Sequence, residues 1–397
     1  MMLSRLSYVN RIFMSNMLKI IRATTVPMSL DAFCKGMLKE LSEKYEVIAL
    51  SSPGEEMAAI AQREGVKAIA VPMERHIALW KDFASLCKLI SVFRKEKPAM
   101  VHSMTPKAGL LCMLAGWITK VPVRVHTFTG LVFPTASGVK REVLMLTDRL
   151  TCACATHVIA EGRGVKNDLV DNSITKKPIR VLGHGNVRGV DMEFYSRRPE
   201  VMDIVTQKAL NTQNLFTFLF VGRIVGDKGI NELCHAFGRI HDQYPNTRLW
   251  LVGAFEKVLD PLRAETMALI EDNRSGIEYL GPKSGDELLA YYAAADCYVQ
   301  PSYREGFPNT VLEAGAMGLP SIVTDINGSR EIIVEGQNGT IIPSKNSQAL
   351  YEAMWRMINH KEWRESMAVN ARRMVAERFE QSYVRKCLYE FYEEVLG

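Results

Sequence analysis

Two glutamates stand eight positions apart around a short turn. Glu305 precedes the stretch Gly306–Thr310, which reads GFPNT, and Glu313 follows it within a run of small residues. The run TVLEAGAMG predicts a helix that Asn309 or Thr310 can cap, with Glu305 on the loop before it and Glu313 about one turn in. Two such carboxylates can accept hydrogen bonds from the hydroxyl groups of one ligand, while the helix N-terminus favours an anion. Taken alone, the spacing also fits two unrelated surface charges.

A second turn suited to an anion lies earlier, in the stretch FVGRIVGDKG at 220–229. The strand expected there ends at Val221, Gly222 and Arg223 turn the chain, and Lys228 stands at the opening of the next helix. Two cations beside free backbone N–H groups suit a diphosphate. An arginine and a lysine at a turn are also common as solvated surface charges.

Short β-branched runs alternate with helical patterns, which predicts parallel sheets covered on both faces. In such sheets ligands bind at the carboxyl ends of the strands, where both turns fall. Strands are expected at 17–24, 45–51, 66–71, 99–103, 123–128, 156–160 and 178–183, and then at 215–224, 247–253, 277–281, 296–302 and 320–324. Helices are expected at 29–44, 55–65, 78–97, 106–120, 141–155 and 381–396.

With 397 residues, the chain is too long for one ordinary core, and we expect two Rossmann-like domains joined by a hinge near residue 191. The N-terminal domain would span 17–191 and the C-terminal domain 192–378. The last segment, 379–397, reads as a helix, and whether it crosses back to the N-terminal domain stays open. Residues 1–16 read as an N-terminal extension, with Met14 or Met17 as an alternative start.

Charge and composition narrow the function classes. No apolar run reaches the roughly 18–20 residues that a membrane-spanning helix needs, and no signal peptide is recognisable. The eight cysteines lack paired CxxC spacing, so we interpret them as core residues in a reducing cytoplasm. Residues 1–191 carry a net charge of +11 and residues 192–397 a net charge of −6. A basic half predicts an anionic partner, or merely reflects uneven solvation; nucleic acid is disfavoured because no aromatic residues interleave the basic ones.

Together, the stretches EGFPNTVLEA and VGR…KG resemble the donor site of retaining glycosyltransferases of family 4, which have the GT-B fold: two Rossmann-like domains facing across a deep cleft. The resemblance covers essentially the whole chain. It implies that Arg223 and Lys228 hold a diphosphate, Glu305 the transferred sugar and Glu313 the ribose, with no metal and no cofactor; no Asp-x-Asp motif is present. The donor-binding residues it implies are Gly222, Gly306, Phe307, Pro308, Asn309, Thr310 and Glu313.

The same resemblance assigns the acceptor to the N-terminal domain. It implies a set of cleft residues at predicted strand ends and turns, in which Lys107 could meet an acceptor phosphate and the apolar loop 130–138 a lipid chain. Three departures from the family pattern stand out: no glycine-rich loop at 24–30, Thr129 in place of a histidine, and an insertion at 187–188. The residues are His102, Lys107, His126, Thr129, Gly183, Gly185 and Asn186.

We therefore expect a retaining, metal-independent glycosyltransferase of cell-surface polysaccharide synthesis. The donor would be a nucleoside-diphosphate sugar, with UDP-N-acetylhexosamine or a related deoxysugar favoured, and the acceptor a lipid-linked or other saccharide, as for capsule or O-antigen. The expected location is the cytoplasm, with peripheral contact between the basic N-terminal domain and the cytoplasmic face of an anionic inner membrane left open. Two alternatives remain: a UDP-sugar epimerase of the same fold, and a non-catalytic sugar-nucleotide-binding module.

Overall fold

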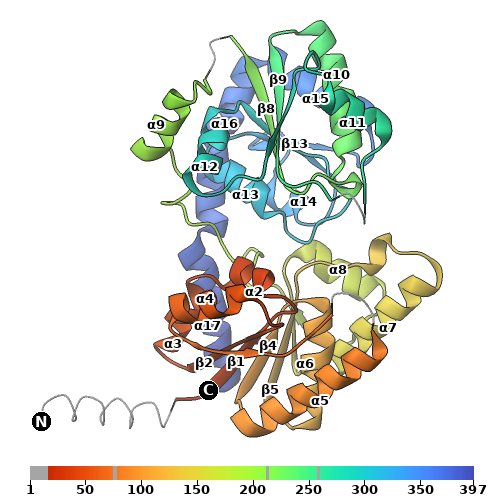
Figure 1. Cartoon of the computed structure of the whole chain (residues 1–397), viewed down its shortest axis with the longest axis vertical. Coiled ribbons are helices and arrows are strands. Elements are labelled where there is room, and N and C mark those ends of the chain that lie inside the picture. The colour runs from red at the N-terminus through yellow and green to blue at the C-terminus, as the bar shows by residue number, and fades with distance from the viewer. Residues whose placement is uncertain (1–16, 75–77, 212–213, 257–259) are drawn as a thin grey trace, which may run out of the picture. The chain divides into compact units, whose positions relative to one another are not determined.

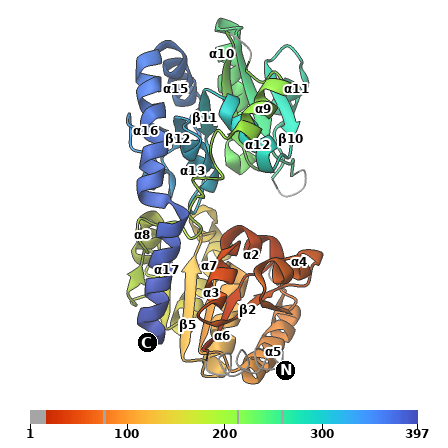
Figure 2. The same ribbon diagram turned by 90° about the vertical axis from the view of Figure 1, so that its left-hand side faces the viewer.

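The computed structural model describes residues 17–74, 78–211, 214–256 and 260–397, so the predicted extension at 1–16 lies outside the described residues. Contacts divide the chain into two compact units. Unit 1 comprises the chain up to Glu161, Val165–Arg188 and Val384–Gly397; unit 2 comprises Gly162–Gly164 and Gly189–Tyr383. The main division therefore falls at Gly189, two residues before the predicted hinge. Figures 1 and 2 show each unit as a sheet between layers of helices.

Unit 1 contains a parallel sheet in the order β3-β2-β1-β4-β5-β6-β7. The chain leaves β1 in one direction as far as β3 and then in the other from β4 onward, which is the strand order of a doubly wound fold. All seven predicted strands of this half are present. They are β1 (Lys19–Ala23), β2 (Glu46–Ser51), β3 (Lys67–Ala70), β4 (Met100–Ser103), β5 (Val123–Phe128), β6 (His157–Ala160) and β7 (Ile179–Arg180).

Two helical layers cover this sheet. α5, α6 and α7 lie side by side on one face (Figure 1), where Leu89, Leu111 and Met145 share a core with Ile21 of β1. On the opposite face, α2, α3, α4 and α17 bury their apolar residues against Ile20. The helices are α2 (Pro27–Cys34), α3 (Met37–Ser42), α4 (Glu55–Glu64), α5 (Leu79–Glu96), α6 (Pro106–Ile118), α7 (Gly138–Cys154), α8 (Arg163–Asp171) and α17 (Gln381–Leu396).

Unit 2 contains a second parallel sheet, in the order β10-β9-β8-β11-β12-β13. Its strands are β8 (Phe216–Val221), β9 (Thr247–Val252), β10 (Ile277–Gly281), β11 (Cys297–Gln300), β12 (Ser321–Thr324) and β13 (Gly339–Ile342). Its helices are α9 (Pro199–Gln207), α10 (Ile230–Gln243), α11 (Ala264–Glu271), α12 (Gly285–Ala294), α13 (Asn309–Ala316), α14 (Ser329–Ile332), α15 (Ser347–Asn359) and α16 (Lys361–Phe379).

Three local predictions differ from the structure. The helix expected over 29–44 is two helices, because Gly36 adopts φ +76° between α2 and α3. β13 was not predicted as a strand. Its four residues form one because they pair with β12, and local sequence does not show that contact. The residue that precedes α13 is Pro308 and not Asn309 or Thr310, and no side chain caps that helix.

Candidate active site

The turn after β8 is held in a compact form by glycine. Gly229 adopts φ +74°, and a Cβ there would stand 2.0 Å from the carbonyl oxygen of Pro301, so the turn lies directly against the end of β11. Lys228 ends a short 3₁₀ turn, Gly226–Lys228, just before α10. Arg223 is exposed, and among the described residues no protein group bonds to it. Because its guanidinium has no protein partner among the described residues and it lies five residues before Lys228, Arg223 is available to bind an anion.

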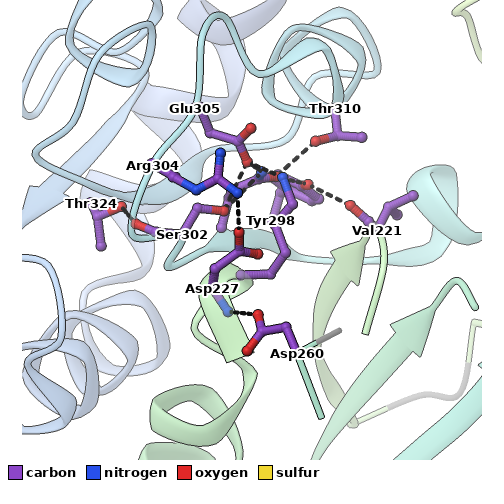
Figure 3. A network of polar contacts seen from close by, with 11 residues as sticks. Val221, Asp227, Asp260, Tyr298, Ser302, Arg304, Glu305, Thr310 and Thr324 are labelled. Atoms are coloured by element: carbon purple, nitrogen blue, oxygen red, sulfur yellow. Dashed lines mark hydrogen bonds and ion pairs between the residues drawn. The ribbon is translucent and has the colours of Figure 1, made fainter. Parts of the chain in front are cut away.

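Glu305 is the centre of a hydrogen-bond network (Figure 3). Its Oε1 atom forms an ion pair with Lys228 Nζ. The same oxygen accepts hydrogen bonds from Gln300 Nε2 at 2.7 Å and from Ser302 Oγ at 2.9 Å. In the part of the chain that the structure describes, no protein group donates to Oε2. One carboxylate oxygen is thus fixed by protein, and the other remains able to accept from a ligand hydroxyl.

Gln300 connects Glu305 to the start of α13. Its amide oxygen accepts hydrogen bonds from Thr310 Oγ1, at 2.7 Å, and from the hydroxyl of Tyr298. Tyr298 also reaches the carbonyl oxygen of Val221, at 3.2 Å, and so joins this network to the end of β8. Burial raises the pKa of Tyr298 well above its ordinary value, which keeps the hydroxyl proton in place as a donor.

Glu313 lies inside α13 and is only 7% exposed. Tyr292 donates a hydrogen bond to its Oε2 over 3.3 Å, and burial raises the pKa of that tyrosine well above its usual range. The helix can lie this deep because Gly315 approaches α16: a Cβ there would meet Val375 at 2.7 Å. The small residues of α13 therefore allow a close approach to α16.

The loop between the two glutamates is packed and braced. Phe307 is buried with its ring centroid 5.4 Å from that of Phe379, so this residue serves the core. Gly328 lies so close that a Cβ would stand 2.6 Å from the carbonyl oxygen of Gly306. Arg304 donates to Asp227 at 2.8 Å (Figure 3). Pro308 is buried, and Gly306, Asn309 and Thr310 are half-buried.

On the acceptor side, unit 1 buries both His102 and His126, and a contact of either with a ligand stays a prediction. His102 is 1% exposed and contacts Arg22, Tyr392 and Thr127. His126 is 2% exposed and lies beneath Gly109, where a Cβ would be 2.4 Å from its ring. Both side chains point into the helix layers because strand residues alternate between faces, and both faces of this sheet are covered.

The other acceptor-side residues are placed less deeply. Lys107 forms an ion pair with Asp82 at 2.5 Å. Thr129 donates to the carbonyl oxygen of Met104 at 3.0 Å. The segment around Gly183, Gly185 and Asn186 is a turn with positive φ at all three residues. Their contacts with a substrate stay predictions.

The structure adds residues that the sequence did not single out. Gln300, Ser302, Tyr298 and Tyr292 hold the two glutamates, and one signal could have found the first of them. Gln300 is the polar end of a fully buried strand, CYVQ, and a buried amide needs partners.

The described residues contain neither a metal-binding cluster nor a membrane-spanning helix. No group of three or more His, Cys, Asp or Glu side chains lies close enough to hold a metal ion. Among the described helices, none combines the length and the apolar character needed to span a bilayer.

Comparison with known proteins matches both units. The model "Glycosyl transferases group 1" matches residues 203–374, and "Glycosyl transferase 4-like domain" matches residues 33–185. The capsular polysaccharide biosynthesis glycosyltransferase CapM of Staphylococcus aureus is 32% identical over 95% of this chain and 97% of its own length. The UDP-Gal:alpha-D-GlcNAc-diphosphoundecaprenol alpha-1,3-galactosyltransferase of Escherichia coli is 27% identical over 75% of this chain and 76% of its own.

Among solved structures, the Anabaena protein Alr3699/HepE in complex with UDP and glucose superposes with a TM-score of 0.77 at 16% identity, covering 96% of this chain and all of that one. At this identity the likeness establishes the fold. Two matched models and a relative similar along nearly its whole length establish the family. The chain belongs to the group 1 glycosyltransferases with a family-4-like N-terminal domain, and it is a glycosyltransferase of the GT-B fold.

Proposed function

We propose that this glycosyltransferase acts with retention of configuration and without a metal, moving a sugar from a nucleoside diphosphate to a lipid-linked or other saccharide acceptor. The ion pair between Lys228 and Glu305 is the observation that carries the proposal. The bond to be broken joins a sugar carbon to a phosphate oxygen, so groups that serve the sugar and the phosphate must adjoin. A cation for the phosphate and a carboxylate for the sugar meet at this point.

In the transition state, the site must above all stabilise the negative charge that develops on the leaving phosphate. Lys228, the unengaged Arg223 and the backbone N–H groups of the turn supply positive potential there without a bound cation. Glu313 would accept from the ribose hydroxyls, as acidic residues do in dinucleotide folds. Glu305 Oε2 would accept from a sugar hydroxyl.

The contacts of Glu305 argue against a covalent route of the kind retaining glycosidases use. Three donors on Oε1 draw electron density from the carboxylate and so reduce the nucleophilicity of both of its oxygens. We therefore favour attack by the acceptor on the face that the phosphate leaves, with a phosphate oxygen taking the acceptor proton. Proton NMR of the product's anomeric signal would test retention, and activity in excess EDTA would test metal independence.

For the donor we propose a UDP-sugar, with UDP-N-acetylhexosamines and related deoxysugars tested first. The Escherichia coli relative is named for UDP-galactose, and the Anabaena protein was crystallised with UDP and glucose. Titration calorimetry with UDP, GDP and ADP identifies the nucleobase of the donor. We expect UDP to bind most tightly and Glu313→Ala to weaken it by about 1–3 kcal/mol. Glu362→Ala, at an exposed position of α16, is the control.

The outcomes of this titration separate the competing functions. Absence of nucleotide binding by folded protein would overturn the donor-site assignment. Binding without transfer to any acceptor would favour a non-catalytic module, whereas slow formation of an epimerised UDP-sugar would favour the epimerase alternative.

For the acceptor we propose a lipid-linked saccharide reached at a membrane surface. The Escherichia coli relative is named for a diphosphoundecaprenol acceptor. In unit 1, large apolar side chains stand in solvent on the outer side of the α5–α6–α7 layer: Leu79, Trp80 and Phe83 on α5 and Val139 and Leu146 on α7, with Trp80 88% exposed. The predicted apolar loop contributes less, because its Phe133 is fully buried.

Exposed basic residues, Lys88 and Lys140, accompany this apolar set and suit anionic headgroups. Co-sedimentation with vesicles of phosphatidylglycerol and phosphatidylethanolamine tests the proposal. We expect Trp80→Ser combined with Phe83→Ser to lower the bound fraction. Val369→Ser, which removes an equally exposed apolar residue from α16 of unit 2, should leave it unchanged. Equal binding by all three proteins would contradict a membrane role for this layer.

A further inference from the structure

Unit 1 buries an arginine that has no carboxylate partner. Arg22, one residue before the end of β1, is 1% exposed. It forms no salt bridge among the described residues, and the segments outside them contain no aspartate or glutamate. Arginine does not lose its proton in proteins, so a full positive charge lies inside the unit. A buried charge without compensation is strongly destabilising, so a source of negative charge is needed.

The contacts of the guanidinium are all neutral. Nη1 donates to His102 Nδ1 at 2.9 Å and to the Tyr392 hydroxyl, and Nη2 lies 2.8 Å from Met104 Sδ. Burial lowers the pKa of His102 well below 6.5, so this imidazole accepts from Arg22 and adds no charge. Burial raises the pKa of Tyr392 to about 12, so its hydroxyl also stays neutral. Nη2 also donates to Cys34 Sγ at 3.4 Å.

One donor of the guanidinium is unused, and Arg22 also lines a small cavity. Arg22 Nε is buried without a hydrogen-bond partner. Arg22 is among the residues that line a cavity of about 20 Å³ in the same unit, together with Thr127 and Asn186. Thr127 Oγ1 lies 2.7 Å from His102 Nε2 and accepts its proton when Nδ1 accepts from Arg22, so the threonine hydroxyl hydrogen is left to donate elsewhere. The remaining lining is mostly apolar, including Ile159, Leu182 and Leu388.

We propose that this cavity binds one monatomic anion, chloride, which compensates the buried charge of Arg22. Its volume of about 20 Å³ has room for about one water-sized particle, which suits a single small ion. The available donors, Arg22 Nε and the Thr127 hydroxyl, suit an anion and give an aqueous cation nothing to bind. Leu388 and Tyr392 belong to α17, so the bound anion stabilises the seating of the C-terminal helix on the sheet of unit 1. This inference is independent of the proposed donor and acceptor.

Thermal unfolding of the full chain tests the site. Sodium chloride is titrated against sodium gluconate at constant ionic strength, so that only the identity of the anion changes. We expect chloride to raise the wild-type midpoint along a saturating curve, by roughly 2–4 °C. Arg22→Met, which keeps an unbranched chain but no charge, should show no chloride dependence. Thr127→Val keeps Arg22 and should shift the chloride concentration at half-effect upward, which preserves the test if Arg22→Met does not fold.

Crystals grown in sodium bromide give the direct readout. We expect one anomalous peak within contact distance of Arg22 Nε. A wild-type midpoint that is identical in chloride and gluconate, or a cavity without a bromide peak, would overturn the proposal.

Discussion

Lys228 and Glu305 lie 77 residues apart in sequence and form an ion pair at the carboxyl edge of the unit 2 sheet. The lysine comes from the turn after β8 and the glutamate from the loop after β11, and these two strands are neighbours in the sheet. Their side chains are 18% and 14% exposed, so the pair is largely shielded from water while remaining open to a ligand. The donor's phosphate and sugar ends would meet at this pair.

Replacing Lys228 by Met should lower kcat by about 10²–10³, the cost of removing one preorganised group at developing charge. Steady-state kinetics with a saturating UDP-sugar provide the measurement. Lys283 forms a more exposed ion pair with Glu287 at 3.1 Å in the same unit, so Lys283→Met is the matched control and should retain activity. Wild-type kcat in Lys228→Met would remove this lysine from the mechanism.

Gln300→Glu should reduce kcat more than it reduces affinity for UDP. The change replaces the amide that donates to Glu305 with a second carboxylate, so Glu305 loses a buried hydrogen bond and gains a repulsive neighbour. A loss of 1–3 kcal/mol corresponds to a fall in kcat of about 10- to 100-fold. Because Gln300 acts through Glu305, it is a positioning residue, and the split between kcat and the UDP Kd distinguishes this role from loss of the fold.

The control for this change is Gln348→Glu on α15. Gln348 also donates its amide to a glutamate, Glu352, at 2.7 Å, but both residues are exposed. The same chemical change should therefore be nearly neutral there. Equal losses in the two variants would show that the Gln300 amide has no special relation to catalysis.

The main residues of the donor site could be predicted from the sequence because their spacing depends on short, local connections. The spacing from Glu305 to Glu313 across a turn, and from Gly222 to Lys228, is set by strand-to-helix connections that follow from hydrophobic periodicity. Periodicity also predicts the parallel strands of both units except β13. The contacts that orient Glu305 are long-range: Gln300 and Ser302 are near in sequence, but Lys228 reaches Glu305 only after the strands pair.

The surroundings of the two histidines could not be predicted from the sequence. His102 lies one residue before the end of β4 and His126 two residues before the end of β5, close to the edge where functional residues of parallel sheets are expected. Which way a strand-end side chain points depends on register and on the helices that cover each face. Tyr392 contacts His102 from 290 residues away, and local sequence does not encode that contact. Gly36 similarly divides a continuous helical pattern by a single positive φ.

Gly328→Ala should lower both stability and UDP affinity, because the added Cβ would stand 2.6 Å from the carbonyl oxygen of Gly306 in the donor loop. Gly281→Ala separates this contact from backbone strain. Gly281 has φ +70°, close to the +75° of Gly328, but nothing lies within 4 Å of a Cβ there. Thermal unfolding should show a cost from positive φ in both variants, whereas calorimetry should show weaker UDP binding in Gly328→Ala alone. Intact UDP binding there would mean that the 306–308 loop moves without consequence.

Unit 1 should lose stability as the pH falls below about 6.5. Burial lowers the pKa of His126 to about 3, and that of His102 well below 6.5. As the pH falls below 6.5, these two histidines therefore bind protons in the unfolded chain but not in the folded chain, which favours unfolding. Asp148 acts in the opposite direction, because burial raises its pKa to about 7 and the folded chain then holds the extra proton. Near pH 5 these three groups together give a net difference of about one proton, a slope of roughly 1.4 kcal/mol per pH unit.

Asp148→Asn isolates the two histidines. This variant removes the opposing proton, so the slope of unfolding free energy against pH between 6.5 and 5 should rise to about two protons, whereas His126→Gln should lower it from one proton toward zero. Urea unfolding at pH 7, 6 and 5, followed by hydrogen exchange of the β4 and β5 amides to report on unit 1, measures both. A slope that stays the same in both variants would mean that the histidines take up protons in the folded state, and their burial would then not control the acid stability of this unit.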